Sequence, residues 1–116
     1  MDYWKIQDAF YERMKKDYEG GAIANPVYKP YFQWKFYGES VNTLTRELCF
    51  QIMKEAQREL EELDNRHPGA HEQLLVEPTL DDVRKPYKGY DDDCFLYSYL
   101  IGIEAEITNI FVMKCG

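Results

Sequence analysis

The carboxylates of this chain are the residues whose types and spacing come closest to a chemical site. Three consecutive aspartates, Asp91-Asp92-Asp93, precede an apolar stretch in which Glu104 and Glu106 stand two residues apart. Carboxylates placed in this way can bind Mg²⁺ or Ca²⁺, or work as an acid–base pair. A metal-assisted hydrolase would also need a nearby Lys, Arg or His, and the nearest candidate is Lys114. We keep this enzyme as an alternative, and we predict no catalytic residue and no metal site.

The other residues with chemical potential form no recognisable motif. His67 and His71 lie in the sequence HPGAH without the cysteine pair that completes a zinc site of this kind. Cys49, Cys94 and Cys115 form no CxxC pair, and three aspartates before Cys94 would raise the pKa of its thiol and lower its reactivity. The chain also has no phosphate-binding glycine loop and no nucleophile elbow. We therefore expect no cofactor.

The charge of the chain is concentrated in its second half. Residues 1–54 contain 7 acids and 8 bases, whereas residues 55–116 contain 14 acids and 6 bases. Direct binding to nucleic acid requires clustered Lys and Arg, so we expect none. A protein partner with a basic surface would be attracted to the acidic half. The alternative is that the charge only keeps the protein soluble.

The chain has the size of one domain, residues 1–116, with 45% apolar residues and 16% aromatic residues. Its start, MDYWKIQDAF, has an acid at position two and no apolar core, which is untypical of a signal peptide. No apolar run approaches the length of about 20 residues of a membrane span, so no membrane partner is expected. Three cysteines leave an odd thiol, which favours a reducing, cytoplasmic location.

The longest pattern in the chain, Cys94–Ile107, predicts a central strand. Its odd-numbered positions from Phe95 to Ile107 are apolar or aromatic, while Glu104 and Glu106 fall on even positions. Side chains alternate between the two faces of a strand, so this alternation indicates one dry face and one wet face. Fourteen residues would make a very long strand, and Gly102 is the expected bend.

The rest of the chain is expected to complete a small α+β domain. Further strands are predicted over 31–37 and 110–114, and residues 73–78 form either a strand or an extended connector. Helices are predicted over 2–17 and about 40–65, and a loop over 79–93. These elements predict an antiparallel sheet of three or four strands with two helices packed on one face.

The function most consistent with these features is a non-enzymatic, acidic protein-binding module. Its partner would present a basic, nucleic-acid-handling surface, as expected for an inhibitor such as a phage anti-defence or toxin-immunity protein. A self-associating structural protein using the aromatic strand 31–37 is a further alternative, and a homo-oligomer is left open. The predicted partner-binding residues are acids and aromatic residues: Asp91, Asp92, Asp93, Glu104, Glu106, Tyr87, Tyr90 and Phe50.

Overall fold

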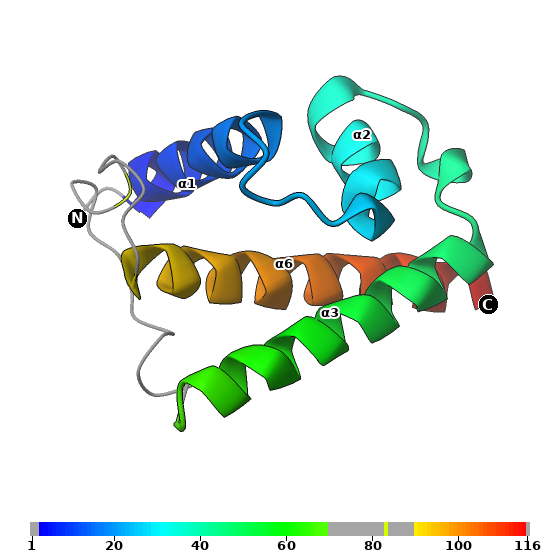
Figure 1. Cartoon of the computed structure of the whole chain (residues 1–116). Helices are drawn as coiled ribbons and strands as arrows, with labels where there is room; N and C mark the ends of the chain where they lie inside the picture. Colours follow the sequence, from blue (N-terminus) through cyan, green and yellow to red (C-terminus); the bar gives the residue numbers. More distant parts are fainter. Residues whose placement is uncertain (1–2, 70–82, 84–89, 116) are drawn as a thin grey trace.

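The computed structural model describes residues 3–69, 83 and 90–115, and this part of the chain is helical (Figure 1). Its elements are α1 (Tyr3–Glu19), η1 (Pro26–Tyr28), α2 (Lys29–Tyr37), η2 (Val41–Thr43), α3 (Arg46–Arg66) and α6 (Tyr90–Cys115), where η1 and η2 are short 3-10 turns. These described residues contain no strand. The predicted α+β fold with an antiparallel sheet is therefore wrong, and the described chain is all-α.

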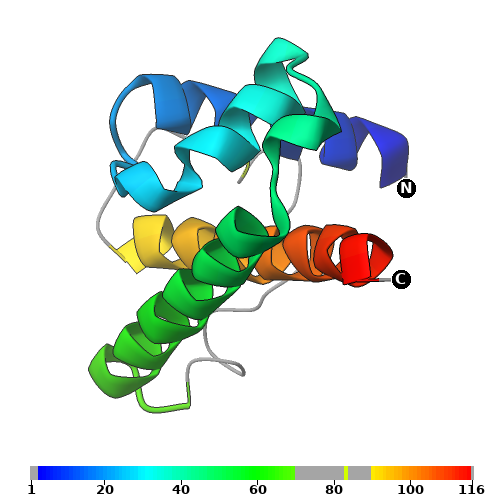
Figure 2. The ribbon, with the colours of Figure 1, turned by 90° about the vertical axis from the view of Figure 1, so that its right-hand side faces the viewer.

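The long helix α6 runs through the middle of the molecule. The helices α1 and α2 lie above α6 in both views, whereas α3 lies mostly below α6 in Figure 1 and crosses it in Figure 2. α3 begins beside the end of α6 and runs back toward its start (Figure 1). α6 is therefore covered from two directions.

The stretch predicted as the central strand is the middle of α6. Leu96, Leu100, Ile103, Ile107 and Ile110 recur at intervals of four and three residues, and the last four of them are buried. Because α6 is covered on two sides, it carries apolar residues around most of its circumference. In such a helix, apolar residues also occur at every second position, which imitates the alternation of a strand. Gly102, the predicted bend, is an exposed mid-helix residue, and the predicted closing strand 110–114 continues the same helix.

The second predicted strand, 31–37, is also helical, and forms α2. Pro30 lies in the first turn of α2, where a proline favours a helix because no backbone donor is needed there. Phe32 and Phe36 are four residues apart, and their rings stack with centroids 5.6 Å apart. Gly38 then ends the helix in the left-handed conformation, with φ of 74°.

The two predicted helices are confirmed, with one changed boundary. The prediction over 2–17 corresponds to α1, which ends at Gly20 and Gly21, the latter with φ of 85°. The prediction over 40–65 corresponds to α3, which begins only at Arg46. The reason is that Thr45 caps it by accepting a hydrogen bond from the Leu48 amide at 3.2 Å, while Ser40 caps η2.

Two of the remaining predicted elements fall largely outside the description. The predicted strand 73–78 lies outside the described residues. So does the predicted loop over 79–93, except for Val83 and for residues 90–93, which form the first turn of α6.

Aromatic rings join the α1–α2 layer together and to α6. Phe10 of α1 contacts Tyr99 of α6 edge to face, with ring centroids 5.2 Å apart. Tyr18 of α1 stacks on Phe32 of α2 at 4.3 Å. Ring pairs of this kind add about 0.5–1.5 kcal/mol each beyond the area they bury. They hold α1 against α2 and α6.

Within the described chain, α6 is also the helix whose length and composition would allow it to cross a membrane, over Asp93–Cys115. The prediction that no apolar run is long enough for a membrane span therefore does not hold for α6. The core helix of a globular protein meets the same criterion, and α6 packs between two layers of helices (Figure 1). However, only 33% of the apolar 18-residue window within this stretch is buried inside the molecule, and Ile101, Val112 and Met113 are exposed.

The neighbours Leu100 and Ile101 provide a direct test of the helical assignment. Leu100 is fully buried and Ile101 is 36% exposed, whereas a strand would bury Ile101 and expose Leu100. We expect Leu100→Ala to lower the free energy of unfolding by about 2–5 kcal/mol and Ile101→Ala by less than about 1 kcal/mol. Urea unfolding of both variants at low protein concentration, followed by circular dichroism, measures this. The reverse order of effects would contradict the helix.

Candidate functional site

The glutamates predicted to share one strand face, Glu104 and Glu106, lie on different sides of α6. The Glu104 carboxylate accepts a hydrogen bond from the Gln57 side chain of α3 at 3.2 Å. The Glu106 carboxylate accepts one from the Tyr31 hydroxyl of α2 at 2.6 Å. Two residues in a helix are separated by about 200° around its axis. The helix therefore separates the two carboxylates, and the expected acid–base or metal-binding pair is not assembled.

Glu106 belongs instead to a polar cluster between α2 and α6. Lys35 forms an ion pair with Glu106, and its ammonium lies 5.6 Å from the centre of the Tyr31 ring. The Tyr11 hydroxyl of α1 donates a hydrogen bond to the Lys35 carbonyl at 2.9 Å. Tyr31 is only 1% exposed, and burial, followed by its hydrogen bond to Glu106, raises the pKa of its hydroxyl above the ordinary value. This cluster joins α1, α2 and α6.

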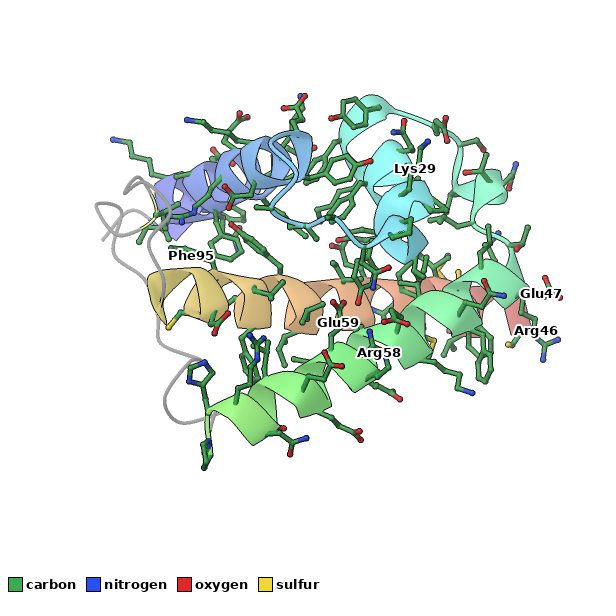
Figure 3. The ribbon with its side chains drawn as sticks, viewed as in Figure 1. Lys29, Arg46, Glu47, Arg58, Glu59 and Phe95 are labelled. Atoms are coloured by element: carbon green, nitrogen blue, oxygen red, sulfur yellow. The ribbon has the colours of Figure 1, made fainter. Side chains whose placement is uncertain are left out.

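A second buried tyrosine joins η1 to α3 in the same way. The Tyr28 hydroxyl donates a hydrogen bond to the Glu59 carboxylate, on the side of α3 that faces α2 and η1 (Figure 3). Burial, followed by the Glu59 hydrogen bond, raises the pKa of Tyr28. Arg58 forms ion pairs with Glu55 and Glu62 and so neutralises part of the acidic surface of α3.

A buried charged pair, which the sequence reading did not identify, lies where α1 meets α6. Arg13 and Asp17 form an ion pair at 3.3 Å, and the Tyr99 hydroxyl donates a hydrogen bond to Asp17 at 2.6 Å. Arg13 also donates to the Val83 carbonyl at 3.1 Å, and its guanidinium lies 3.6 Å from the centre of the Phe95 ring (Figure 3). The available signal was a pair of opposite charges four residues apart beside the apolar face of α1.

α3 and α6 pack antiparallel with a regular register. Two contacts lie seven residues apart along both helices: Phe50 with Phe111, and Gln57 with Glu104. Seven residues further along both helices, burial, followed by the negative charge of Asp64, raises the pKa of Tyr97. A seven-residue repeat is the spacing at which two packed helices keep the same faces together.

This antiparallel register brings the acidic second half of α3 beside the start of α6. We call this part of the helix pair the acidic end, and it consists of Glu61, Glu62, Asp64 and Asp91–Asp93. The three α3 acids are exposed. Carboxylates at the first turn of a helix are also stabilised by the positive end of the helix dipole, which favours Asp91–Asp93 in this position.

Asp93, the last of the three consecutive aspartates, contacts the end of α3. Its Oδ2 lies 2.7 Å from Nε2 of His67, just after the end of α3, and 3.9 Å from the Arg66 guanidinium. Asp93 therefore ties the end of α3 to the start of α6. Tyr90, Asp91 and Asp92 belong to the first turn of α6. Tyr87 and His71 lie outside the described residues.

Phe50, the remaining predicted partner-binding residue, lies at the opposite end of the helix pair. It is 49% exposed and contacts Phe111, with ring centroids 6.2 Å apart. The Lys54 ammonium lies 5.3 Å from the centre of the Phe50 ring, and the Arg46 guanidinium lies 5.8 Å from that of Phe111. Phe50 and Asp93 therefore lie at opposite ends of the helix pair.

Residues able to hold a metal or act as a nucleophile are dispersed. Within residues 3–69, 83 and 90–115 there is no group of three or more His, Cys, Asp or Glu side chains that could hold a metal ion. Cys49 is buried, Cys94 is half-buried, and Cys115 is exposed. Burial raises the pKa of the Cys49 thiol, which disfavours the reactive thiolate.

Comparisons of the chain with protein-family models, with curated proteins and with solved structures give no match.

Removing the Glu106 carboxylate tests whether this residue is structural. We expect Glu106→Ala to lower the free energy of unfolding by about 1–3 kcal/mol, because the buried Tyr31 hydroxyl loses its acceptor. Glu104→Ala, which affects only an exposed hydrogen bond, should change it by less than about 0.5 kcal/mol. Adding Tyr31→Phe to Glu106→Ala should recover part of the loss. Equal effects of the two glutamate variants in urea unfolding would contradict this assignment.

The buried tyrosines predict a loss of stability at alkaline pH. The raised pKa values of Tyr28 and Tyr31 mean that both hydroxyls stay protonated in the folded state above pH about 10, where the unfolded state loses these protons. The free energy of unfolding should therefore be unaffected below this pH and fall above it, by up to about 1.4 kcal/mol per pH unit for each tyrosine. Urea midpoints between pH 8 and 11 or so test this. In the double variant Tyr28→Phe/Tyr31→Phe the slope should be shallower, and an unchanged slope would contradict the prediction.

Proposed function

We propose that this protein is a non-enzymatic, acidic protein-binding module whose acidic end contacts a basic surface of a protein partner. The observation that supports this is the antiparallel pairing of α3 with α6, which gathers carboxylates from two distant segments, 61–64 and 91–93. Of the six acidic residues of the acidic end, Glu62 forms an ion pair with Arg58, and Asp93 lies beside His67 and Arg66. The acidic end therefore keeps an excess of negative charge.

The chemistry of this surface favours a partner rich in Lys and Arg. Exposed carboxylates that lie close together create a field that steers a basic surface toward them and fixes its orientation. The best match is the phosphate-binding surface of a nucleic-acid-handling protein, which the acidic end would cover as an inhibitor or immunity-type protein does. Both proteins would then meet in the cytoplasm.

The two alternative functions have less support. The hydrolase required Glu104 and Glu106 on one face, and they contact different neighbouring helices. Self-association through a strand at 31–37 fails because this segment is α2, whose Tyr31 and Phe32 are buried.

Charge reversal at the acidic end tests the proposed function. The wild-type chain would be immobilised, and a partner captured from the source lysate would be purified and titrated. We expect the dissociation constant to rise steeply with salt as the Debye length shortens below about 10 Å. Asp91→Lys/Asp92→Lys should raise it at least about tenfold, equivalent to about 1.4 kcal/mol.

A matched variant separates local from overall charge. Asp8→Lys/Glu12→Lys makes the same change in net charge at two exposed positions of α1. This control should weaken binding by less than about threefold. Equal losses in both double variants, or binding that is indifferent to salt, would contradict the proposed acidic interface.

A further inference from the structure

A second surface of the α3–α6 pair shares Glu61 and Asp64 with the acidic end but extends away from it along both helices. The α1–α2 layer reaches α3 and α6 through one flank of the pair, with Tyr28 on Glu59 and Tyr31 on Glu106. The contacts of Gln57 with Glu104 and of Phe50 with Phe111 lie on the other flank. No described element covers this second flank, which we call the open face (Figures 1 and 2).

Apart from Glu104, the part of the open face formed by α6 is uncharged. Ile101, Ala105, Thr108 and Val112 recur at intervals of four and three residues, so they line one side of the helix. Ile101 is 36% exposed and Val112 is 60% exposed. This side accounts for much of the apolar surface of α6 that the molecule leaves uncovered.

The part of the open face formed by α3 is charged, and the sign of this charge changes from one end of the helix to the other. Phe50, Lys54, Gln57, Glu61 and Asp64 recur at the same intervals, and all five are exposed. The cation Lys54 lies in the first half of the row, toward Arg46, which lies at the end where α6 finishes (Figure 3). The acids Glu61 and Asp64 lie in the second half, and Gln57 separates the two signs.

We propose that the open face binds the open face of a second copy of this chain in a two-fold dimer. The axis would lie in the interface, at right angles to the helices, near Gln57 and Glu104. Each α3 would then run antiparallel to α3 of the second copy, and each α6 to the other α6. In a two-fold contact residue i meets j while j meets i, so Lys54 of each copy would face Glu61 of the other.

Charge complementarity favours this occupant over others. A uniformly basic partner would be attracted at Glu61 and Asp64 but repelled at Lys54 and Arg46. A second copy, turned end for end, matches both halves of the row at once. The uncharged side chains of Ile101, Ala105 and Val112 would be buried between the two α6 helices, which supplies the apolar contribution to association. Glu104 would lie near the axis, where it accepts a hydrogen bond from Gln57 of its own chain.

Sedimentation equilibrium of the whole chain tests the dimer. We expect wild-type protein to be dimeric at about 100 μM and Ile101→Asp to raise the dissociation constant at least about a hundredfold, equivalent to about 2.7 kcal/mol. Val41→Asp is the matched control, since Val41 is also a β-branched residue, is 41% exposed, and lies in η2 away from the open face. It should leave the dissociation constant within about threefold of the wild-type value.

A charge swap tests the orientation of the two copies. Lys54→Glu and Glu61→Lys should each weaken the dimer at least about tenfold, and the double variant should recover to within about threefold of wild type, because it restores opposite charges across the axis. Circular dichroism of each variant checks that the helices remain folded. A wild-type chain that stays monomeric overturns the proposal. Binding of this monomer to phosphatidylglycerol vesicles would indicate that the exposed side of α6 contacts a lipid surface instead. A dimer indifferent to Ile101→Asp, or a swap without recovery, overturns it too.

Discussion

The antiparallel packing of α3 against α6 is the contact on which the rest of the structure depends. Leu100, Ile103 and Ile107 of α6 are fully buried together with Ile52 and other apolar residues of α3. Burying side chains of this size contributes about 1.5–3 kcal/mol each, more than any exposed ion pair in the protein. The seven-residue register of this packing also decides which charges become neighbours.

Polar contacts then fix the position of the α1–α2 layer over α6. Tyr31 with Glu106, Tyr28 with Glu59 and Tyr99 with Asp17 repeat one arrangement, in which an inward-facing tyrosine hydroxyl donates to a carboxylate on another helix. Such a bond contributes little net energy, but breaking it leaves a buried polar group unpaired, which is costly. These pairs therefore select one arrangement of the helices over alternative packings. They also give several of the acids a structural role, so net charge alone overstates the surface available to a partner.

The sequence pattern identified two helices correctly and misread two others, for a physical reason. α1 and α3 have one apolar face and one polar face, so their apolar residues recur at helical spacing. α6 and α2 are rich in large apolar residues all round, and in such a segment alternating and helical spacings coexist. In α6, Phe95, Tyr97 and Tyr99 alternate while Leu96, Leu100 and Ile103 follow the helix, and only the length of the segment and the helices around it decide between the two.

The sequence by itself determined the excess of acid in the second half, the exposure of Phe50 beside the apolar face of α3, and the helical character of α1 and α3. These properties depend on composition and on local spacing. Only the tertiary structure decided that Glu104 and Glu106 contact different helices. Residues two apart share one face of a strand, but in a helix they are separated by about 200° around the axis. It also decided that Asp93 meets His67, because the antiparallel packing of α3 and α6 joins segments distant in sequence. The segment 91–93 thus lies beside the acidic second half of α3, while Glu106 is held within the fold by Tyr31 and Lys35.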